Sequence, residues 1–69
     1  MEFKQGHYYK MRGGERSQYI GKTDFNEEQP HIFVHLNDGN AYMYTEAGTF
    51  ISTDTDSNYD IVEELPQAG

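Results

Sequence analysis

Segment 54–60 alternates Asp, Asp, Asn and Asp with other residues, which is the spacing at which a calcium-binding loop places its oxygen ligands. A calcium loop of this kind also needs a glycine at its sixth position and a glutamate at its twelfth, where this sequence has Tyr59 and Leu65. No helical pattern flanks the segment. The sequence therefore predicts an exposed polar turn here and no calcium site.

His31 and His35 are the second candidates for a metal site, because both imidazoles would lie on the same face of one extended segment. Four residues at ~3.3 Å each separate the two side chains by ~13 Å, which is too far for one ion to bind both. We therefore expect these histidines to face solvent or to pack against rings. We expect no bound metal and no cofactor.

Catalytic chemistry has little support in this sequence. The chain contains no cysteine, and none of its serines stands in a G-x-S-x-G or Ser-His-Asp context. The adjacent carboxylates Glu27-Glu28 and Glu63-Glu64 would point to opposite faces of a strand, so neither pair suits general acid–base catalysis. Gly13-Gly14 is a turn without the following helix that a phosphate loop needs. We expect a protein that is not an enzyme and has no catalytic residues.

The elements that must position these side chains are predicted to be β-strands, and residues 31–45 carry the clearest pattern, that of a β-hairpin. Asn37 to Asn40 supply its turn. The first half alternates aliphatic and aromatic side chains, the period-2 pattern of a strand with one buried face. These side chains are Ile32, Val34 and Leu36 against His31, Phe33 and His35.

Two turn lengths are open for this hairpin, and they exchange the faces of its second strand. A two-residue loop, Asp38-Gly39, would put Tyr42 and Tyr44 on the face opposite the aliphatic residues. A three-residue loop that starts at Asn37 and ends with a left-handed Gly39 would instead pair Tyr44 with Ile32 in the core. Aspartate followed by a left-handed glycine favours the three-residue loop.

The other predicted strands are His7–Arg12, Arg16–Ile20, Thr49–Thr53 and Tyr59–Leu65, with glycine turns after the first and before the third. Residues 22–30 read as an exposed loop that Phe25 pins to the core, with a helical turn over 24–29 as an option. Residues 66–69 should form a frayed tail. The expected core consists of Ile32, Val34, Leu36, Tyr44, Ile61 and Val62, surrounded by Tyr19, Ile20, Phe25, Phe50 and Ile51.

Short strands at this spacing predict a single all-β domain over residues 1–69, either a small antiparallel SH3-like barrel or a strongly bent meander of five to six strands. In an SH3-like barrel the last strand commonly pairs with the first, which would bring Glu63 and Glu64 near Lys10 and Arg12. Hydrophobic residues are 35% of the 69, so the core must be small. No apolar stretch resembles a signal peptide or a membrane span, so we expect a soluble, cytoplasmic protein, monomeric or weakly dimeric.

Charge is distributed unevenly along the chain. Residues 1–22 contain all five basic residues and two acids, a local charge of +3, whereas residues 23–69 contain ten acids and no Lys or Arg, a local charge of −10. The net charge is −7. Such a chain repels nucleic acid and favours a basic partner, although acidic surface can also serve solubility alone.

Four stretches carry a resemblance to a known family. Gly6 to Gly14 follows G-x-x-Y-x-x-R-x-G, and it is followed by Asp38-Gly39, by 45–48 with its turn glycine, and by Ser57-Asn-Tyr-Asp-Ile-Val62. This pattern resembles small phage, prophage and bacterial proteins of no agreed activity, and it implies an SH3-like barrel. Many members have Trp where Tyr44 stands. Small acidic phage proteins also include anti-CRISPR inhibitors, which is an analogy of class.

Two functions are open. The first is an inhibitor that presents carboxylates to a basic groove, such as that of a CRISPR effector or another nucleic-acid-binding complex, without binding nucleic acid or membrane itself. The second is an SH3-like accessory module that binds a peptide or protein in an aromatic groove. The acidic site would use Glu27, Glu28, Asp54, Asp56, Glu63 and Glu64. The aromatic groove would use Tyr8, Tyr9, Tyr42 and Tyr59.

Overall fold

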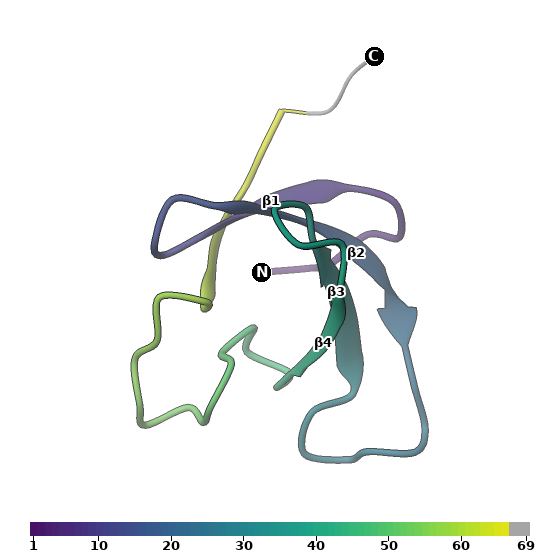
Figure 1. Cartoon of the computed structure of the whole chain (residues 1–69). Helices are drawn as coiled ribbons and strands as arrows, with labels where there is room; N and C mark the ends of the chain where they lie inside the picture. Colours follow the sequence, from purple (N-terminus) through teal and green to yellow (C-terminus); the bar gives the residue numbers. More distant parts are fainter. Residues whose placement is uncertain (67–69) are drawn as a thin grey trace.

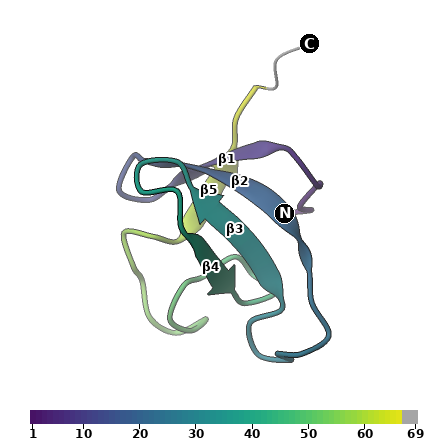
Figure 2. The same cartoon turned by 45° about the vertical axis from the view of Figure 1, so that its right-hand side comes forward.

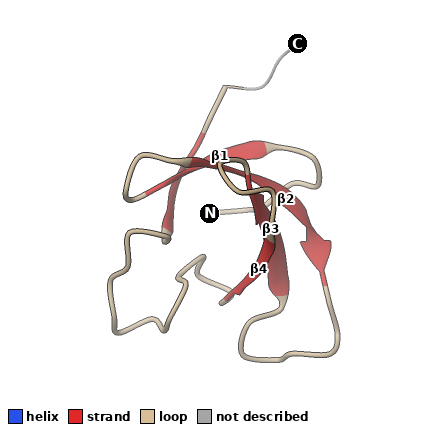
Figure 3. Cartoon of the chain, viewed as in Figure 1, coloured by secondary structure: helices blue, strands red, loops and turns tan. Residues whose placement is uncertain are grey.

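Five antiparallel strands form one sheet in the computed structural model, which describes residues 1–66. The strands are β1 (Tyr8–Met11), β2 (Arg16–Lys22), β3 (His31–His35), β4 (Ala41–Tyr44) and β5 (Ile61–Glu64). The order across the sheet is β4-β3-β2-β1-β5, and these residues contain no helix (Figures 1 and 3). The all-β prediction is confirmed, and the sheet is a bent meander that does not close into a barrel, since β4 and β5 remain its two edges (Figure 2).

The first and last strands pair as the sequence predicted. In the β1–β5 register Tyr9 lies opposite Glu64, and Lys10 lies opposite Glu63. Arg12 lies beyond this pairing, where its backbone N–H donates to the carbonyl of Asp60 at 2.8 Å. Long-range pairing of the two ends of the chain thus places the acidic β5 beside the basic β1.

The register of the β3–β4 hairpin differs from both predicted registers. Val34 lies opposite Ala41, and His35 N–H donates to the Asn40 carbonyl at 2.9 Å, so that the loop has four residues, 36–39. Gly39 has φ +72° and is left-handed, as expected. The Asp38 carboxylate accepts the Asn40 N–H at 2.9 Å, which stabilises a longer loop than the sequence pattern favoured.

The buried face of the sheet is the aromatic face, contrary to the predicted aliphatic core. Phe33 is fully buried, Ile32 and Val34 are half-buried on the opposite face, and Leu36 is 46% exposed. A shift of one residue along a strand moves all its side chains to the other face of the sheet. The aromatic face is buried here because rings bury more area than aliphatic side chains do. The prediction was correct for Tyr44 and Ile61 and wrong for the other aliphatic residues, Ile32, Val34, Leu36 and Val62. The core consists of Tyr9, Met11, Tyr19, Phe33, Tyr44 and Ile61.

The two strand histidines pack against rings on this buried face, which is one of the two expected outcomes. His31 Nδ1 lies 2.7 Å from the Tyr19 hydroxyl, and His35 Nε2 lies 2.6 Å from the Tyr44 hydroxyl. Each imidazole is buried with a hydrogen-bond partner, so its burial does not leave a polar atom unsatisfied. Hydrogen bonds to tyrosine hydroxyls therefore allow both histidines, which are polar, to face the core.

The N-terminal segment lies against the inner face of the sheet and contributes Phe3, which the sequence analysis did not place in the core. Its ring centroid lies 5.0 Å from that of Phe33 and 5.5 Å from that of Tyr9. A side chain at Gly48, which has φ +84°, would place its Cβ 2.8 Å from the Phe3 ring. The turn that follows β4 therefore requires glycine at position 48, both because of the positive φ angle and because of the close contact with Phe3.

Several peripheral predictions are wrong. Phe25 is 100% exposed and does not pin its loop, and Ile20, Ile51 and Val62 are also exposed. The optional helical turn over 24–29 does not form. Segment 49–53 forms no strand and contributes one isolated bridge, between residues 52 and 55. Of the predicted tail, Pro66 is exposed and residues 67–69 lie outside the described residues.

Candidate functional site

The six carboxylates of the predicted acidic site are all exposed, but the structure does not bring them into one patch. Two lie in the β2–β3 loop, two in the β4–β5 loop and two on β5, at the far edge of the sheet. They are, in that order, Glu27 and Glu28, Asp54 and Asp56, and Glu63 and Glu64.

The β2–β3 and β4–β5 loops both lie in the lower half of Figure 1. The side-chain amide of Gln29 donates to the Phe50 carbonyl at 2.7 Å, which ties one loop to the other. Glu28 and Thr53 line the same hollow, of about 500 Å³. Tertiary contacts thus bring Glu28 close to the chain at Asp54, although the two residues are far apart in sequence.

Two further carboxylates complete this patch. Glu46 lines the hollow with Glu28, and it lines a neighbouring hollow with Asp24 and Glu27. We call the carboxylates that line these two hollows, together with Asp54, which follows Thr53 in the chain, the acidic rim: Asp24, Glu27, Glu28, Glu46 and Asp54. Asp24 and Glu46 were not among the predicted site residues, because only the folded chain places the start of the β4–β5 loop beside the β2–β3 loop.

Most of the acidic rim makes no ion pair with the described residues, although Lys22 lines the same hollow as Asp24, Glu27 and Glu46. Glu46 Oε1 lies 3.0 Å from Lys22 Nζ and Oε2 lies 3.2 Å from His31 Nε2. These contacts, that with Lys22 first, hold the pKa of Glu46 below its ordinary value. Among residues 1–66 the other four carboxylates have no Lys, Arg or His nitrogen within 4.0 Å. The rim therefore keeps an unbalanced negative charge.

The remaining predicted carboxylates are placed elsewhere. Asp56 lies 3.7 Å from Arg12, and Glu64 lies 2.9 Å from His7. Glu63 lies opposite Lys10 on β5. Acidic residues of the C-terminal part thus lie close to basic residues of the N-terminal part near β1 and β5, and not at the acidic rim.

Asp60 has a structural role in the segment that resembled a calcium loop. Its buried carboxylate accepts the backbone N–H of Phe50 and of Ser57, each at 2.9 Å, and lies 3.3 Å from Arg12. Burial raises the pKa of this carboxyl, but these hydrogen bonds and the guanidinium outweigh it and lower the pKa overall. The closing S-x-x-D pattern, Ser57 to Asp60, was the sequence signal for this anchor.

The four tyrosines of the predicted aromatic groove do not line a common surface. Tyr9 is fully buried, its hydroxyl accepts the Lys4 N–H at 2.8 Å, and it cannot contact a ligand. Tyr8 lies on the outer face of β1, as the alternating burial of that strand requires. Tyr42 and Tyr59 remain together near the edge of the inner face, with ring centroids 6.5 Å apart.

Tyr42 and Tyr59 form a partly exposed aromatic patch around a buried imidazole. The His35 ring stacks on Tyr42 at 3.9 Å and lies 5.4 Å from Tyr59. The Tyr42 hydroxyl donates to the Asp38 carboxylate at 2.6 Å, which lowers the pKa of Asp38 and raises that of Tyr42. Burial lowers the pKa of His35, so this imidazole is held in its neutral form at neutral pH.

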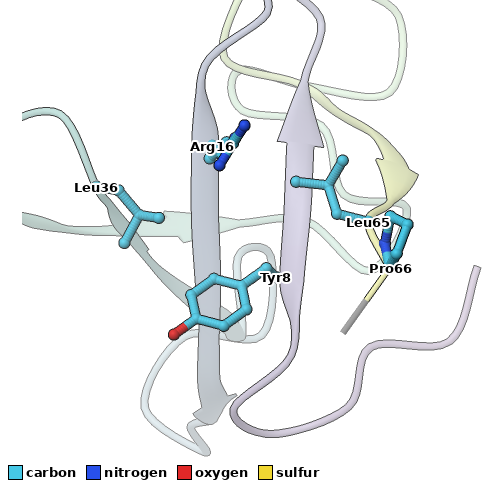
Figure 4. Close-up of a pocket in the computed structure, with 5 residues that line it drawn as sticks. All are labelled: Tyr8, Arg16, Leu36, Leu65 and Pro66. Atoms are coloured by element: carbon cyan, nitrogen blue, oxygen red, sulfur yellow. The ribbon is translucent and has the colours of Figure 1, made fainter. Parts of the chain in front are cut away.

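A shallow groove of about 410 Å³ crosses the outer face of β1 and β2 (Figure 4). Tyr8 and Arg16 lie on its floor, Leu36 lies at one side, and Leu65 and Pro66 lie at the other. The sequence analysis assigned Leu36 to the core and did not select Arg16 or Leu65. We call this feature the outer groove.

No group of three or more His, Asp or Glu side chains is placed to hold a metal ion within the part of the chain that the structure describes. Two buried imidazoles bonded to tyrosine hydroxyls do not offer a free ligand set. The exposed features are suited to binding another molecule. The acidic rim provides negative charge, and the aromatic patch and the outer groove provide apolar surface.

In comparisons with protein-family models, with curated proteins and with solved structures, nothing matches this chain. Across residues 1–66, no helix is long and apolar enough to cross a membrane.

Proposed function

We propose that the protein is a small binding protein without catalytic activity, and that its acidic rim binds a basic protein surface. The observation that carries this proposal is the group of four exposed carboxylates, Asp24, Glu27, Glu28 and Asp54, that have no counter-ion within 4.0 Å among the described residues. Five carboxylates from two loops produce a one-sided field, which steers a cationic partner during association.

The partner class that fits this charge is a protein with a basic groove of the kind that binds nucleic acid. Carboxylates can replace phosphates in such a groove and block it. An analogy of class with small acidic phage proteins suggests one specific form of the proposal, an anti-CRISPR-type inhibitor that acts in the host cytoplasm on a CRISPR effector or another nucleic-acid-binding defence complex. In this form the protein acts as a nucleic-acid mimic and binds no nucleic acid itself.

The test uses a fluorescent arginine-rich peptide as the probe. Reversing three rim charges, Glu27→Lys, Glu28→Lys and Asp54→Lys, should weaken peptide binding about tenfold or more, because attraction becomes repulsion. The matched control reverses the same number of charges elsewhere, with Glu2→Lys, Glu15→Lys and Glu63→Lys. We expect the control to lose much less affinity. Equal losses would show that net charge alone binds the peptide, and the rim would then not be a site.

Salt dependence provides a second measurement on the same complex. Affinity of the unmodified protein should fall steeply as the Debye length shrinks from ~10 Å at 0.1 M salt to ~3 Å at 1 M. The triple rim variant should show a shallower dependence, since fewer charges contribute. Affinity that ignores salt would contradict the electrostatic proposal.

A second candidate function is peptide binding at the aromatic patch, and the observation that favours it is that Tyr59 is 44% exposed beside Tyr42. Aromatic residues with polar hydroxyls are frequent in peptide-binding surfaces. Tyr59→Ser should abolish binding of such a peptide and leave the salt dependence of the arginine-rich peptide unchanged. The two surfaces can thus be assigned separately.

A further inference from the structure

The outer face of the sheet carries aliphatic side chains that are partly or largely exposed. Val34 and Ile32 alternate with the buried residues of β3, and the cross-strand partners are Ala41 and Met43 on β4. All four lie on the outer face, half-buried or exposed. This is the set of residues whose spacing suggested a core strand, so a face with the sequence pattern of a buried surface is open to solvent.

The outer groove is the part of this face that is shaped to receive side chains. Leu36 N–H donates to the Arg16 carbonyl at 3.0 Å, and Leu65 N–H donates to the Tyr8 carbonyl at 3.0 Å. These backbone hydrogen bonds hold the two leucines on opposite sides of the floor that Tyr8 and Arg16 form, as Figure 4 shows. The walls are therefore held by the sheet itself.

The charge at this groove is opposite to the charge of the whole protein. Arg16 is the one charged residue among the five that line it, and Lys10 lies opposite Arg16 in the β1–β2 register. Neither cation has a carboxylate oxygen within 4.0 Å among the described residues, although Glu63 lies opposite Lys10 on β5. An apolar groove with an unpaired guanidinium is complementary to an apolar segment that carries a carboxylate.

We propose that the outer groove binds an extended segment of a partner protein in which apolar side chains alternate with acidic ones. An apolar side chain packs over Tyr8 between Leu36 and Leu65, and a neighbouring carboxylate binds Arg16. A second copy of this chain fits less well, because a twofold contact through this face would bring Arg16 and Lys10 of each copy toward those of the other. The proposal goes beyond the proposed function and concerns the opposite charge on a different face.

The test measures binding of three synthetic nine-residue peptides by changes in backbone amide NMR signals. One alternates leucine and aspartate, one alternates leucine and lysine, and one alternates serine and aspartate. We expect only the leucine–aspartate peptide to bind with a dissociation constant below about 1 mM. Its signal changes should centre on Tyr8, Arg16, Leu36 and Leu65, with the loops of the acidic rim unaffected.

Two variants with matched controls assign the contacts. Arg16→Glu should weaken binding about tenfold, since it replaces attraction by repulsion, whereas Lys4→Glu makes the same charge change at an exposed residue away from the groove. Leu36→Ser should also weaken binding, whereas Ile51→Ser removes an exposed aliphatic side chain from the β4–β5 loop. Leu36 and Ile51 are 46% and 58% exposed, so both serine variants should fold, which their NMR spectra would confirm.

Three results would overturn the proposal. The first is no signal change at about 1 mM leucine–aspartate peptide, which is the upper limit of the expected dissociation constant. The second is equal binding of the leucine–lysine peptide, which would remove the role of Arg16. The third is self-association in sedimentation that Leu36→Ser abolishes and Arg16→Glu leaves unchanged, which would make a second copy the occupant.

Discussion

The inner and outer faces of the sheet are built from the same five strands, yet they differ in chemistry. On the inner face aromatic rings pack together: the ring centroid of Phe33 lies 5.0 Å from that of Phe3 and 4.9 Å from that of Tyr44. This face also buries two histidines that form hydrogen bonds with tyrosine hydroxyls. The outer face carries aliphatic and basic side chains that are half-buried or exposed. Aromatic rings supply the stability of this domain, and the aliphatic residues remain available for contacts.

This difference shows how a small domain can form a core from few hydrophobic residues. A ring buries about 150–250 Å², more than an aliphatic side chain, and edge-to-face pairs add about 0.5–1.5 kcal/mol each. Six core residues supplemented by the N-terminal Phe3 can therefore stabilise 69 residues. The core therefore forms without the aliphatic side chains of β3, which lie on the other face.

The largest expected effect compares neighbouring residues of β3 on opposite faces. Phe33→Ala should lower the free energy of unfolding by about 3–5 kcal/mol, since it leaves a cavity among the rings. Val34→Ala should lower it by about 1 kcal/mol or less, because Val34 is only half-buried. Urea denaturation of both variants measures the difference. Similar losses would mean that both faces contribute to the core.

The next effect compares two aspartates of the β4–β5 loop. Asp60→Asn should cost about 2–3 kcal/mol, because it weakens two backbone hydrogen bonds and the contact with Arg12 on the inner side of the loop. Asp54→Asn should be nearly neutral for thermal stability, since Asp54 is exposed and has no ion pair within the described residues. A large loss for Asp54→Asn would contradict the assignment of Asp60 as the anchor.

A smaller effect concerns pH and the histidine of the inner face. Burial lowers the pKa of His35, so the unfolded chain binds this proton more readily than the folded protein does. The stability associated with neutral His35 is therefore complete above the unfolded pKa of about 6.5 and is lost as pH falls below it toward the lowered pKa.

Melting temperatures of the unmodified protein and of His35→Gln, measured at about pH 7.5 and 5.5, test this linkage. The variant should lose less stability between the two pH values than the unmodified protein does, whatever its stability at the higher pH. An identical loss in both proteins would show that the titration of His35 does not contribute.

The smallest effect is expected at Phe25, an aromatic residue outside both faces. Its side chain is 100% exposed, so Phe25→Ser should change the free energy of unfolding by less than about 0.5 kcal/mol. Calorimetry of this variant beside Phe33→Ala would compare an exposed ring with a buried one. A loss of several degrees in Tm would indicate that the β2–β3 loop packs on the core in solution.

The sequence was sufficient for predictions that depend on local chemistry. Glycines at 39 and 48 mark turns because their positive φ angles suit few other residues, and both turns form. The strands of the first two hairpins appear within two residues of their predicted bounds, since alternation and turn residues act over short distances. The concentration of carboxylates after Lys22 was also evident from the sequence alone, and it indicated a chain of uneven charge.

Tertiary structure decided which face is buried and which carboxylates meet. Alternation on β3 is compatible with either face, and only the packing of Phe3, Tyr9 and Tyr44 against Phe33 selects the aromatic one. Glu28 and Glu46 line one hollow although they are far apart in sequence, where a side-chain hydrogen bond from Gln29 to the Phe50 carbonyl joins their two loops. The buried face and the grouping of carboxylates depend on residues that are distant in sequence, so a local sequence pattern cannot predict them. They are determined by the total area buried and by the polar groups that find hydrogen-bond partners in the folded chain.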